Sequence, residues 1–194
     1  MSARARAAVT ACVAALGVAA CTTSEAGTAI PGSTEPPSNT SEPNSYGAPH
    51  VEHPLNAAAF VADPCAVLAP DQLSIFTVSP GEKDPAAAIC NWHSDADSSS
   101  IGVSWLDRNK NGLADLYRYR DREAYFEETS VEGYPAVFSD TGDYRDDGDC
   151  VITVGVSDTL TFFAGESGLL DGDAACARAR QVAAAVIVTV KGAQ

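Results

Sequence analysis

Hydrophobic and polar positions alternate in the middle of the chain, first in the stretch before residue 106. Ile101, Val103 and Trp105 are separated by single residues, which places their side chains on one face of a strand. A polar stretch, residues 95–100, separates this strand from the apolar segment 89–92. We therefore expect the two strands to pair as a hairpin.

Three more strands are expected further along, at residues 133–138, 150–156 and 160–164. The last two carry an apolar residue at every second position, so these residues share a face. Ser157 and Asp158 between them fit a tight hairpin turn. The alternating apolar residues are Cys150, Ile152, Val154, Val156, Leu160, Phe162 and Ala164.

Helical signals surround these strands. Asp63 suits the N-cap of a short helix, and the prolines that follow suit first-turn positions. Apolar residues at helical spacing predict a helix over residues 113–126. Asp173 is expected to cap a long Ala-rich helix. One side of that helix carries Cys176, Ala179, Ala183, Val186 and Val190.

The predicted order is helix, two strands, helix, three strands, helix. Hairpins dominate this order, and no strand–helix–strand unit recurs. The sequence therefore predicts an α+β fold: a single domain, residues 55–194, with an antiparallel sheet of about five strands. Helices are expected to pack mainly on one face of that sheet.

The first 20 residues have the pattern of a bacterial lipoprotein signal peptide. Two arginines precede a run of mostly Ala and Val, residues 7–19, which is too short to span a membrane. The Val-Ala-Ala-Cys sequence at 18–21 then matches a lipobox, in which the cysteine receives the lipid. We expect residues 1–20 to be removed and Cys21 to anchor the protein at the extracytoplasmic face of the cell membrane. An ordinary secretory signal with a chance cysteine is the alternative.

Residues 21–54 are expected to form a disordered tether. From residue 22 to residue 50 the chain is rich in Thr, Ser, Pro and Glu and has no Lys or Arg. Ile30 and Tyr46 are its only large apolar residues, too few to offset the entropy of an ordered chain. As a flexible coil this stretch would span roughly 30 Å on average.

The charge balance excludes one class of partner. The chain has 12 basic and 26 acidic residues, and removal of Arg4 and Arg6 with the signal peptide leaves a net charge of −16. Such a protein lacks the basic surface that nucleic acids require. The same balance does not favour binding of anionic lipid headgroups by a polybasic segment. We expect membrane contact through the lipid and no nucleic-acid partner.

Four cysteines lie in the predicted domain: Cys65, Cys90, Cys150 and Cys176. An even number in an exported chain indicates two disulfides. Pairing in sequence order closes loops of 25 and 26 residues, and each bond would stabilise by about 3 kcal/mol. This pairing is preferred, although crossed pairings stay open. A metal–thiolate site is disfavoured because no two of these cysteines have C-x-x-C spacing.

Several of these features together resemble a known family. They are Asp-Pro-Cys at 63–65, Cys-x-Trp at 90–92, Gly-x-Pro-Ala-Val at 133–137, and the two late cysteines. The set resembles an actinobacterial family of exported lipoproteins that is catalogued as a domain of unknown function. The resemblance implies a cell-envelope lipoprotein with two disulfides and assigns no catalytic residues. The layout is also similar to the disulfide-bonded extracellular sensor domains of mycobacterial kinases.

One loop has the spacing of a calcium site. Oxygen-bearing side chains occupy positions 1, 3, 5 and 9 of an EF-hand-like pattern, with Gly112 at position 6. Position 12 is Arg118 instead of the expected Glu, and the preceding segment is predicted to be a strand. A polar turn between strand and helix is the alternative. The candidate Ca²⁺ ligands are Asp107, Asn109, Asn111 and Asp115.

Other residues offer weaker candidates for chemistry. His50 and His53 could form half a metal site, whereas His93 is expected to end a strand. The Gly-Glu-Ser-Gly stretch at 165–168 is only superficially similar to a hydrolase nucleophile elbow. Trp92 and Trp105 are expected in the core. A second acidic loop, which either binds a cation or is simply solvated, holds Asp140, Asp143, Asp146, Asp147 and Asp149.

Three functions remain, in order of preference. The first is a non-catalytic binding or accessory lipoprotein whose partner is a small molecule, a lipid or another envelope protein. The second is an enzyme that acts on envelope material through pairs of acidic residues, which requires two facing carboxylates, one with a raised pKa. The third is a structural wall protein that depends on a divalent cation. A deep apolar cleft would favour binding of a lipid or small molecule.

Overall fold

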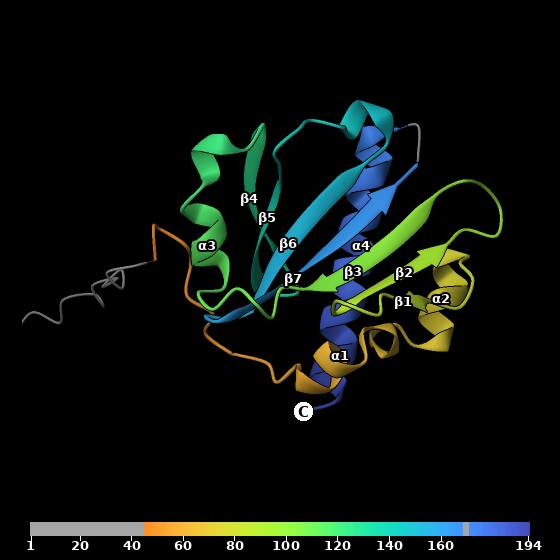
Figure 1. The fold of residues 1–194 in the computed structure, drawn as a ribbon, viewed down its shortest axis with the longest axis horizontal. Helices are drawn as coiled ribbons and strands as arrows, with labels where there is room; N and C mark the ends of the chain where they lie inside the picture. Colours follow the sequence, from red (N-terminus) through yellow and green to blue (C-terminus); the bar gives the residue numbers. More distant parts are fainter. Residues whose placement is uncertain (1–44, 169–170) are drawn as a thin grey trace, which may run out of the picture. The chain divides into compact units, whose positions relative to one another are not determined.

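A computed structural model describes residues 45–168 and 171–194 of the chain. One antiparallel sheet of seven strands, in the order β1-β2-β3-β7-β6-β5-β4, forms its centre (Figure 1). The α+β class and the antiparallel pairing are therefore as predicted. The strands are β1 (Glu82–Lys83), β2 (Ile89–His93), β3 (Ser100–Trp105), β4 (Tyr125–Val131), β5 (Tyr134–Asp140), β6 (Cys150–Ser157) and β7 (Leu160–Ser167).

The helices are few, and only one is long. Asp171 caps the long helix, where its side chain accepts from the N–H groups of Asp173 and Ala174, so Asp173 was wrongly predicted as the cap. The α-helices are α1 (Ala58–Ala62), α2 (Pro70–Phe76), α3 (Leu113–Tyr117) and α4 (Gly172–Gly192). Short 3-10 turns are η1 (Pro64–Val67), η2 (Arg120–Arg122) and η3 (Arg145–Asp147).

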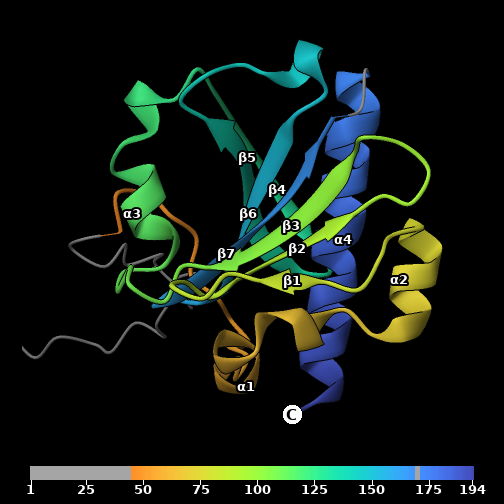
Figure 2. The same ribbon diagram turned by 45° about the vertical axis from the view of Figure 1, so that its right-hand side comes forward.

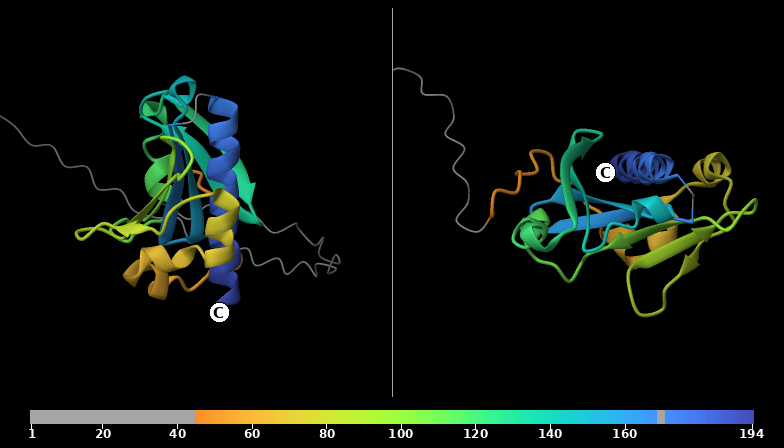
Figure 3. Two further views of the ribbon diagram at one scale, coloured as in Figure 1. Left: turned by 90° about the vertical axis from the view of Figure 1, so that its right-hand side faces the viewer. Right: turned by 90° about the horizontal axis from the view of Figure 1, so that it is seen from above.

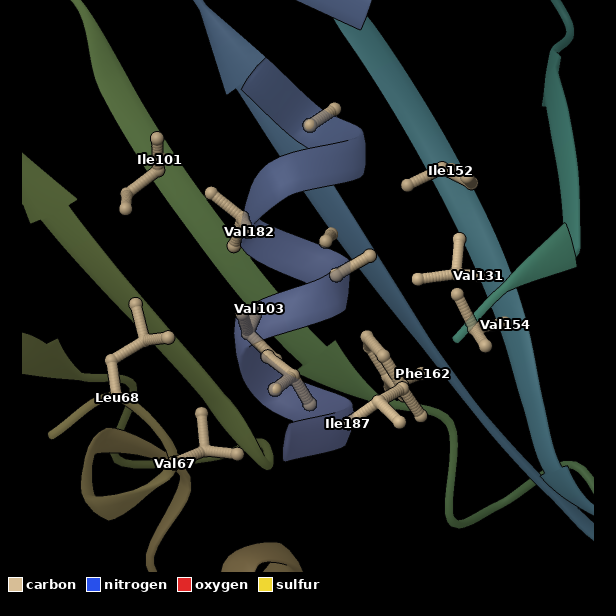
Figure 4. Close-up of a cluster of buried hydrophobic side chains, with 14 of the residues drawn as sticks. Val67, Leu68, Ile101, Val103, Val131, Ile152, Val154, Phe162, Val182 and Ile187 are labelled. Atoms are coloured by element: carbon tan, nitrogen blue, oxygen red, sulfur yellow. The ribbon is translucent and has the colours of Figure 1, made fainter. Parts of the chain in front are cut away.

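The main core lies between α4 and one face of the sheet. Ile101, Val103 and Trp105 of β3 point to this face together with the alternating residues of β6 and β7. Figure 4 shows Val182 and Ile187 of α4 against this layer. Removal of these apolar surfaces from water is the dominant favourable contribution to folding. The buried residues of α4 are Ala175, Ala179, Val182, Ala183, Val186, Ile187 and Val190.

The short helix α3 packs against the opposite face (Figure 3). Leu113 and Tyr117 form a second buried cluster with Val137 of β5, whose neighbours in that strand point to the α4 side. The ring of Tyr117 also meets Phe126 edge-on, with the ring centroids 5.0 Å apart. The sheet therefore lies between α4 and α3 (Figure 2).

The sheet has seven strands and not about five, because two strands were missed. The helix predicted over 113–126 ends at Tyr117, and β4 begins at Tyr125. All seven residues of β4 pair with β5, and the turn between them, Glu132 and Gly133, has φ angles of 52° and 85°. This primed turn and the long ladder outweigh the local helical spacing. The other missed strand, β1, has only two residues.

Two disulfides join the layers, in the preferred sequential pairing. Cys65 in η1 is bonded to Cys90 in β2. Cys150 at the start of β6 is bonded to Cys176 in α4. Each bond ties a helical segment to the sheet.

Packing begins a few residues before Leu55, where the globular domain was expected to start. Val51 is 3% exposed and belongs to the core, although the sequence placed it in the tether. Its N–H donates to the Asp158 carboxylate at 2.9 Å, and the Leu55 N–H donates to the Val156 carbonyl at 2.8 Å. These two hydrogen bonds thus attach residues 51–55 to the β6–β7 hairpin.

Candidate functional site

Two surface depressions adjoin the loop of residues 106–112, which connects β3 to α3. Their volumes are about 550 Å³ and about 490 Å³. Leu106, Arg108 and Asn109 line both of them. The two depressions therefore share a wall, and we treat them as one candidate site, the loop-106 site.

Two largely buried threonine residues contribute to the first depression. Thr153 of β6 and Thr161 of β7 are 8% and 1% exposed, and both line it. They lie on the sheet face opposite the main core, because their neighbours Val154 and Phe162 point to α4. The rigid sheet therefore presents these hydroxyl-bearing residues at fixed positions.

Side chains from α3 and the segments around it complete this first depression. Asp115, Leu116 and Tyr119 line it on the side of α3, and Tyr119 is 42% exposed. Glu123 precedes β4 and lines it as well. Burial, and to a smaller extent the charge of Asp140, raises the pKa of Glu123. Lys110 adds a cation to the lining.

The second depression lies between the same loop, the end of α1 and the turn between β1 and β2. Ala62, Lys83 and the Pro-Ala-Ala-Ala stretch at 85–88 line it. The Lys83 ammonium donates to the carbonyl of Ala62 at 2.6 Å, which joins two of its walls. Trp105 also lines it, and the buried Nε1 of that side chain has no hydrogen-bond partner in the described structure.

Backbone contacts fix the loop that separates the depressions. The N–H of Leu106 donates to the Thr161 carbonyl at 3.0 Å, and the N–H of Asn109 donates to the Leu106 carbonyl at 3.1 Å. Gly112 has a φ of +53°, and a Cβ at this position would lie 2.7 Å from the Asp158 carbonyl oxygen. Only glycine combines this conformation with so close an approach. The backbone conformation at the end of the loop, where α3 begins, is therefore fixed.

The candidate Ca²⁺ ligands all lie around this site, but the loop does not have the form of an EF-hand. A strand precedes it, and Asn111 donates its amide N–H to the Asp115 carboxylate at 2.8 Å. The Lys110 ammonium bonds to the carbonyl of Asp107. Asn109 lines both depressions, whereas Asp107 lines only the second. Within residues 45–168 and 171–194, no three His, Cys, Asp or Glu side chains are grouped to hold a metal ion.

The second acidic loop is partly neutralised by the protein itself. Arg145 forms ion pairs with Asp143 at 2.6 Å and with Glu127 at 2.8 Å. The same guanidinium lies over the ring of Tyr125, 4.0 Å from its centroid. Asp149 accepts hydrogen bonds from the Ser167 hydroxyl and the N–H of the next residue. These contacts favour the interpretation of this loop as a solvated turn.

The histidines and the Gly-Glu-Ser-Gly stretch do not come together. His50 pairs with Asp158 at 2.6 Å on the surface, and the carbonyl of His53 accepts a hydrogen bond from Tyr134. His93 is the exposed last residue of β2. Ser167 ends β7 and donates to Asp149, so it does not occupy a strand-to-helix elbow. Trp92 and Trp105 are 0% and 2% exposed, as expected of core residues.

A buried charge pair away from the loop-106 site was missed. Glu166 of β7 has a fully buried side chain, and its carboxylate lies 3.0 Å from the Arg178 guanidinium of α4. Burial raises the pKa of Glu166 to about 7, Arg178 opposes the rise, and Asp97 and Asp149 add to it. The sequence does carry a signal for this residue. Every second residue of β7 faces the core, so the pattern of Leu160, Phe162 and Ala164 also places Glu166 on that face.

The expected lipidation site, Cys21, lies outside the described residues. Among the helices that the structure does describe, none is long and apolar enough to cross a membrane.

The chain matches the model of a protein family. Residues 16–189 match a family model described as "Protein of unknown function (DUF3558)". The matched range includes Cys21, all seven strands and most of α4. No curated protein and no solved structure matches the chain.

Proposed function

The chain belongs to the DUF3558 family of proteins of unknown function, and we propose that it is a lipid-anchored protein of the cell envelope. In this proposal the folded domain binds a polar envelope component, without catalysis, in the loop-106 site. The lipid on Cys21 keeps the domain at the extracytoplasmic face of the membrane.

Two features support export and anchoring. The lipobox at 18–21 follows a short apolar segment, and the family match begins before it, at residue 16. The domain also carries two disulfides, which form and persist in oxidising compartments outside the cytoplasm. Because the bonds join helical segments to the sheet, a reducing compartment would cost the domain much of its stability.

The observation that carries the binding role is the convergence of polar side chains on the first depression. A loop, a helix and two strands of the sheet contribute a guanidinium, an ammonium, amides, carboxyls and threonine hydroxyls. Ligand sites typically combine a concave surface with a few polar groups fixed by a rigid scaffold. The sheet and the loop of residues 106–112, which ends at Gly112, supply that scaffold here.

The chemistry of the lining favours a polar ligand over a lipid chain. The core beneath α4 is filled by interlocking aliphatic side chains (Figure 4). The lining of the first depression has Leu106 and Leu116 as its aliphatic residues, and its other side chains are polar, charged or tyrosine. An acyl chain would leave these polar groups without hydrogen bonds, at a cost. A sugar or another hydroxylated ligand would satisfy them.

A binding screen with variants of the depression tests the proposal. The full-length Cys21→Ala protein would be applied to an array of oligosaccharides taken from bacterial envelopes, with Thr161→Val and Tyr119→Ala as site variants. We expect a bound oligosaccharide whose signal falls by roughly tenfold in the site variants, since each loses a polar contact. Lys191→Gln, on the last turn of α4, is the control and should bind normally. Binding that ignores both site variants would contradict the proposal.

One observation favours a second function, hydrolysis of an envelope glycan. Asp115 and Glu123 line the same depression, and the pKa of Glu123 is raised. A raised pKa favours the protonated form of a carboxyl group, which is the form that a general acid needs. The enzyme interpretation predicts that the bound oligosaccharide is cleaved and that Glu123→Gln abolishes cleavage while it preserves binding. Binding without cleavage supports the first proposal.

A further inference from the structure

The basic residues of this acidic chain are unevenly distributed. Apart from Arg4 and Arg6, the chain has ten Lys and Arg residues. Half of them fall within the 15 residues from 108 to 122, which form the loop-106 site and the segment after it. We call these five residues the cationic cluster. They are Arg108, Lys110, Arg118, Arg120 and Arg122.

The cationic cluster is nearly free of ion pairs. Its closest carboxylate contact in the described structure is Arg120 to Asp121 at 4.0 Å, between two largely exposed side chains. Elsewhere, Arg145 forms ion pairs with two carboxylates, and Arg178 forms one with the buried Glu166. Lys110 and Arg108 instead donate to the backbone carbonyls of Asp107 and Ala86. A chain with many more acids than bases offers ample carboxylates, so cations that form almost no ion pairs among the described residues stand out.

Two guanidinium groups of the cluster lie against tyrosine rings, in three contacts. Arg118 lies 5.6 Å from the ring centroid of Tyr46 and 5.3 Å from that of Tyr119. Arg122 lies 4.9 Å from the centroid of Tyr119. Stacking over a ring restricts a guanidinium and leaves the N–H groups at its edge available for planar anions. Tyr119 also lines the first depression, so the cluster and the site are continuous.

We infer that the ligand of the loop-106 site is an acidic glycan, whose carboxylate groups are bound by the cationic cluster. This inference rests on the proposed binding function. Arg108 and Lys110 line the site itself, so they would contact an acidic group on the sugar bound there. Arg118 and Arg122 place further guanidinium groups beside Tyr119, where the next sugars of the chain would lie.

The shape of the site favours a chain of sugars over a single small anion. Arg108 and Asn109 line both depressions, so an extended ligand can cross from one to the other over this pair. Hydroxyls and amides in the lining suit the neutral groups of a sugar, and the guanidinium fork suits its carboxylate. An isolated anion would use only the cationic part of this surface.

The local balance of charge argues against an anionic bilayer as the partner. Asp107, Asp115, Asp121 and Glu123 lie among the five cations, so the stretch is nearly neutral as a whole. Attraction to a charged membrane surface sums over all of these groups and over the acidic remainder of the domain. A glycan carboxylate instead contacts single cations at short range, where the neighbouring acids matter less.

A matched pair of oligosaccharides tests the inference. Tetragalacturonate and galactotetraose differ in carrying and lacking carboxylates on the same sugar skeleton. Titration calorimetry with the full-length Cys21→Ala protein should give binding of tetragalacturonate that is at least tenfold tighter than binding of galactotetraose. Added salt should reduce this difference, because exposed charges are screened.

Variants that change the charge by one unit identify the surface responsible. Arg108→Gln should weaken tetragalacturonate binding roughly tenfold, whereas Lys191→Gln, with the same change in net charge, should leave it unchanged. Asp115→Asn removes a carboxylate from the depression and should tighten binding. Unchanged thermal unfolding of each variant confirms that its fold is intact.

Three outcomes of the oligosaccharide experiments would overturn the inference. They are equal affinity for the two tetrasaccharides, no binding of tetragalacturonate at low salt, and equal effects of Arg108→Gln and Lys191→Gln. Stronger binding to phosphatidylglycerol vesicles than to tetragalacturonate would also overturn it. Equal affinity for both tetrasaccharides, lost in Tyr119→Ala, would leave the binding function standing and remove only the acidic specificity.

Discussion

Glu166 is a carboxyl group that the fold buries completely beside Arg178. Its pKa is raised to about 7, chiefly by burial, from an ordinary value of 4.5. Between these two pH values the folded state holds a proton that the unfolded state releases. Folding stability therefore falls as the pH rises through this window, and the loss is complete above it.

Replacement of Glu166 by Gln is expected to remove this pH dependence. The wild-type free energy of unfolding should fall by about 3 kcal/mol from pH 4.5 to pH 8, relative to Glu166→Gln. Urea unfolding of both proteins across this range measures the difference in slope. The exposed Glu52→Gln is the matched control and should keep the wild-type slope. Parallel curves for wild type and Glu166→Gln would contradict the assignment.

Gly81 packs against two groups that cannot move easily. A Cβ at this position would lie 2.4 Å from the Cys90 sulfur and 2.5 Å from Trp92 Nε1. Both side chains are fully buried, so Gly81→Ala should destabilise the domain by about 1–3 kcal/mol. Chemical denaturation measures this loss. Gly192→Ala, where nothing lies within 4 Å of the added carbon, should not destabilise, and equal losses for the two variants would refute the packing argument.

Residues that face the core were easier to predict than residues that form the site. Alternation placed Ile101, Val103 and Trp105 on one face because a strand imposes a period of two. Thr153 and Thr161 occupy the opposite positions of their strands, where a polar residue looks like ordinary solvated surface. Their role as site residues depends on the depression above them, which comes from a loop elsewhere in the chain. No local pattern carries that information.

At the scale of whole elements, the two disulfides each connect a helical segment to the sheet. The loops that they close are almost equal, with separations of 25 and 26 residues. Replacement of Cys150 and Cys176 by Ala should lower the free energy of unfolding by about 2–5 kcal/mol. The double replacement of Cys65 and Cys90 should cost a similar amount, because the loop lengths match. Thermal and urea unfolding of the two variants checks this expectation, and a negligible loss in either would contradict it.

The hairpins were predictable, and the strand β4 was not. The β2–β3 and β6–β7 hairpins follow from alternating apolar residues on both sides of a short polar turn. In β4, by contrast, Glu127 and Glu128 stand among apolar and β-branched residues, and the preceding residues have helical spacing. Pairing along all seven residues with β5 decides the outcome. That contribution is non-local, so propensity alone could not reveal it.

The site follows from the same difference between local and non-local information. The sequence singled out the loop of Asp107, Asn109 and Asn111 for its calcium-like spacing, and this loop does form the centre of the candidate site. Its neighbours in space, Thr153 and Thr161, are some 40 to 50 residues away in the chain. The sequence thus singled out the loop that borders the candidate site, whereas the strand residues of the lining could be identified only from the fold.

At the scale of the whole molecule, the proposed role depends on the protein being held outside the cytoplasm. Cys21→Ala should abolish the covalent lipid and shift the protein from the membrane to the soluble fraction, without a change in unfolding temperature. The proposed anchor and the folded domain are separate in the sequence, so loss of the anchor should leave the domain intact. Fractionation with immunoblotting measures the shift, and Cys12→Ala, within the segment expected to be removed, should remain in the membrane fraction.

Mass spectrometry of the mature protein, extracted from the membranes of its own host, tests the central claim most directly. The account predicts a chain that begins at Cys21 and carries a covalent lipid on that residue, with the four later cysteines oxidised. A mature protein that begins at any other residue, or one with an unmodified Cys21, would contradict the claim that this is a lipid-anchored protein of the envelope.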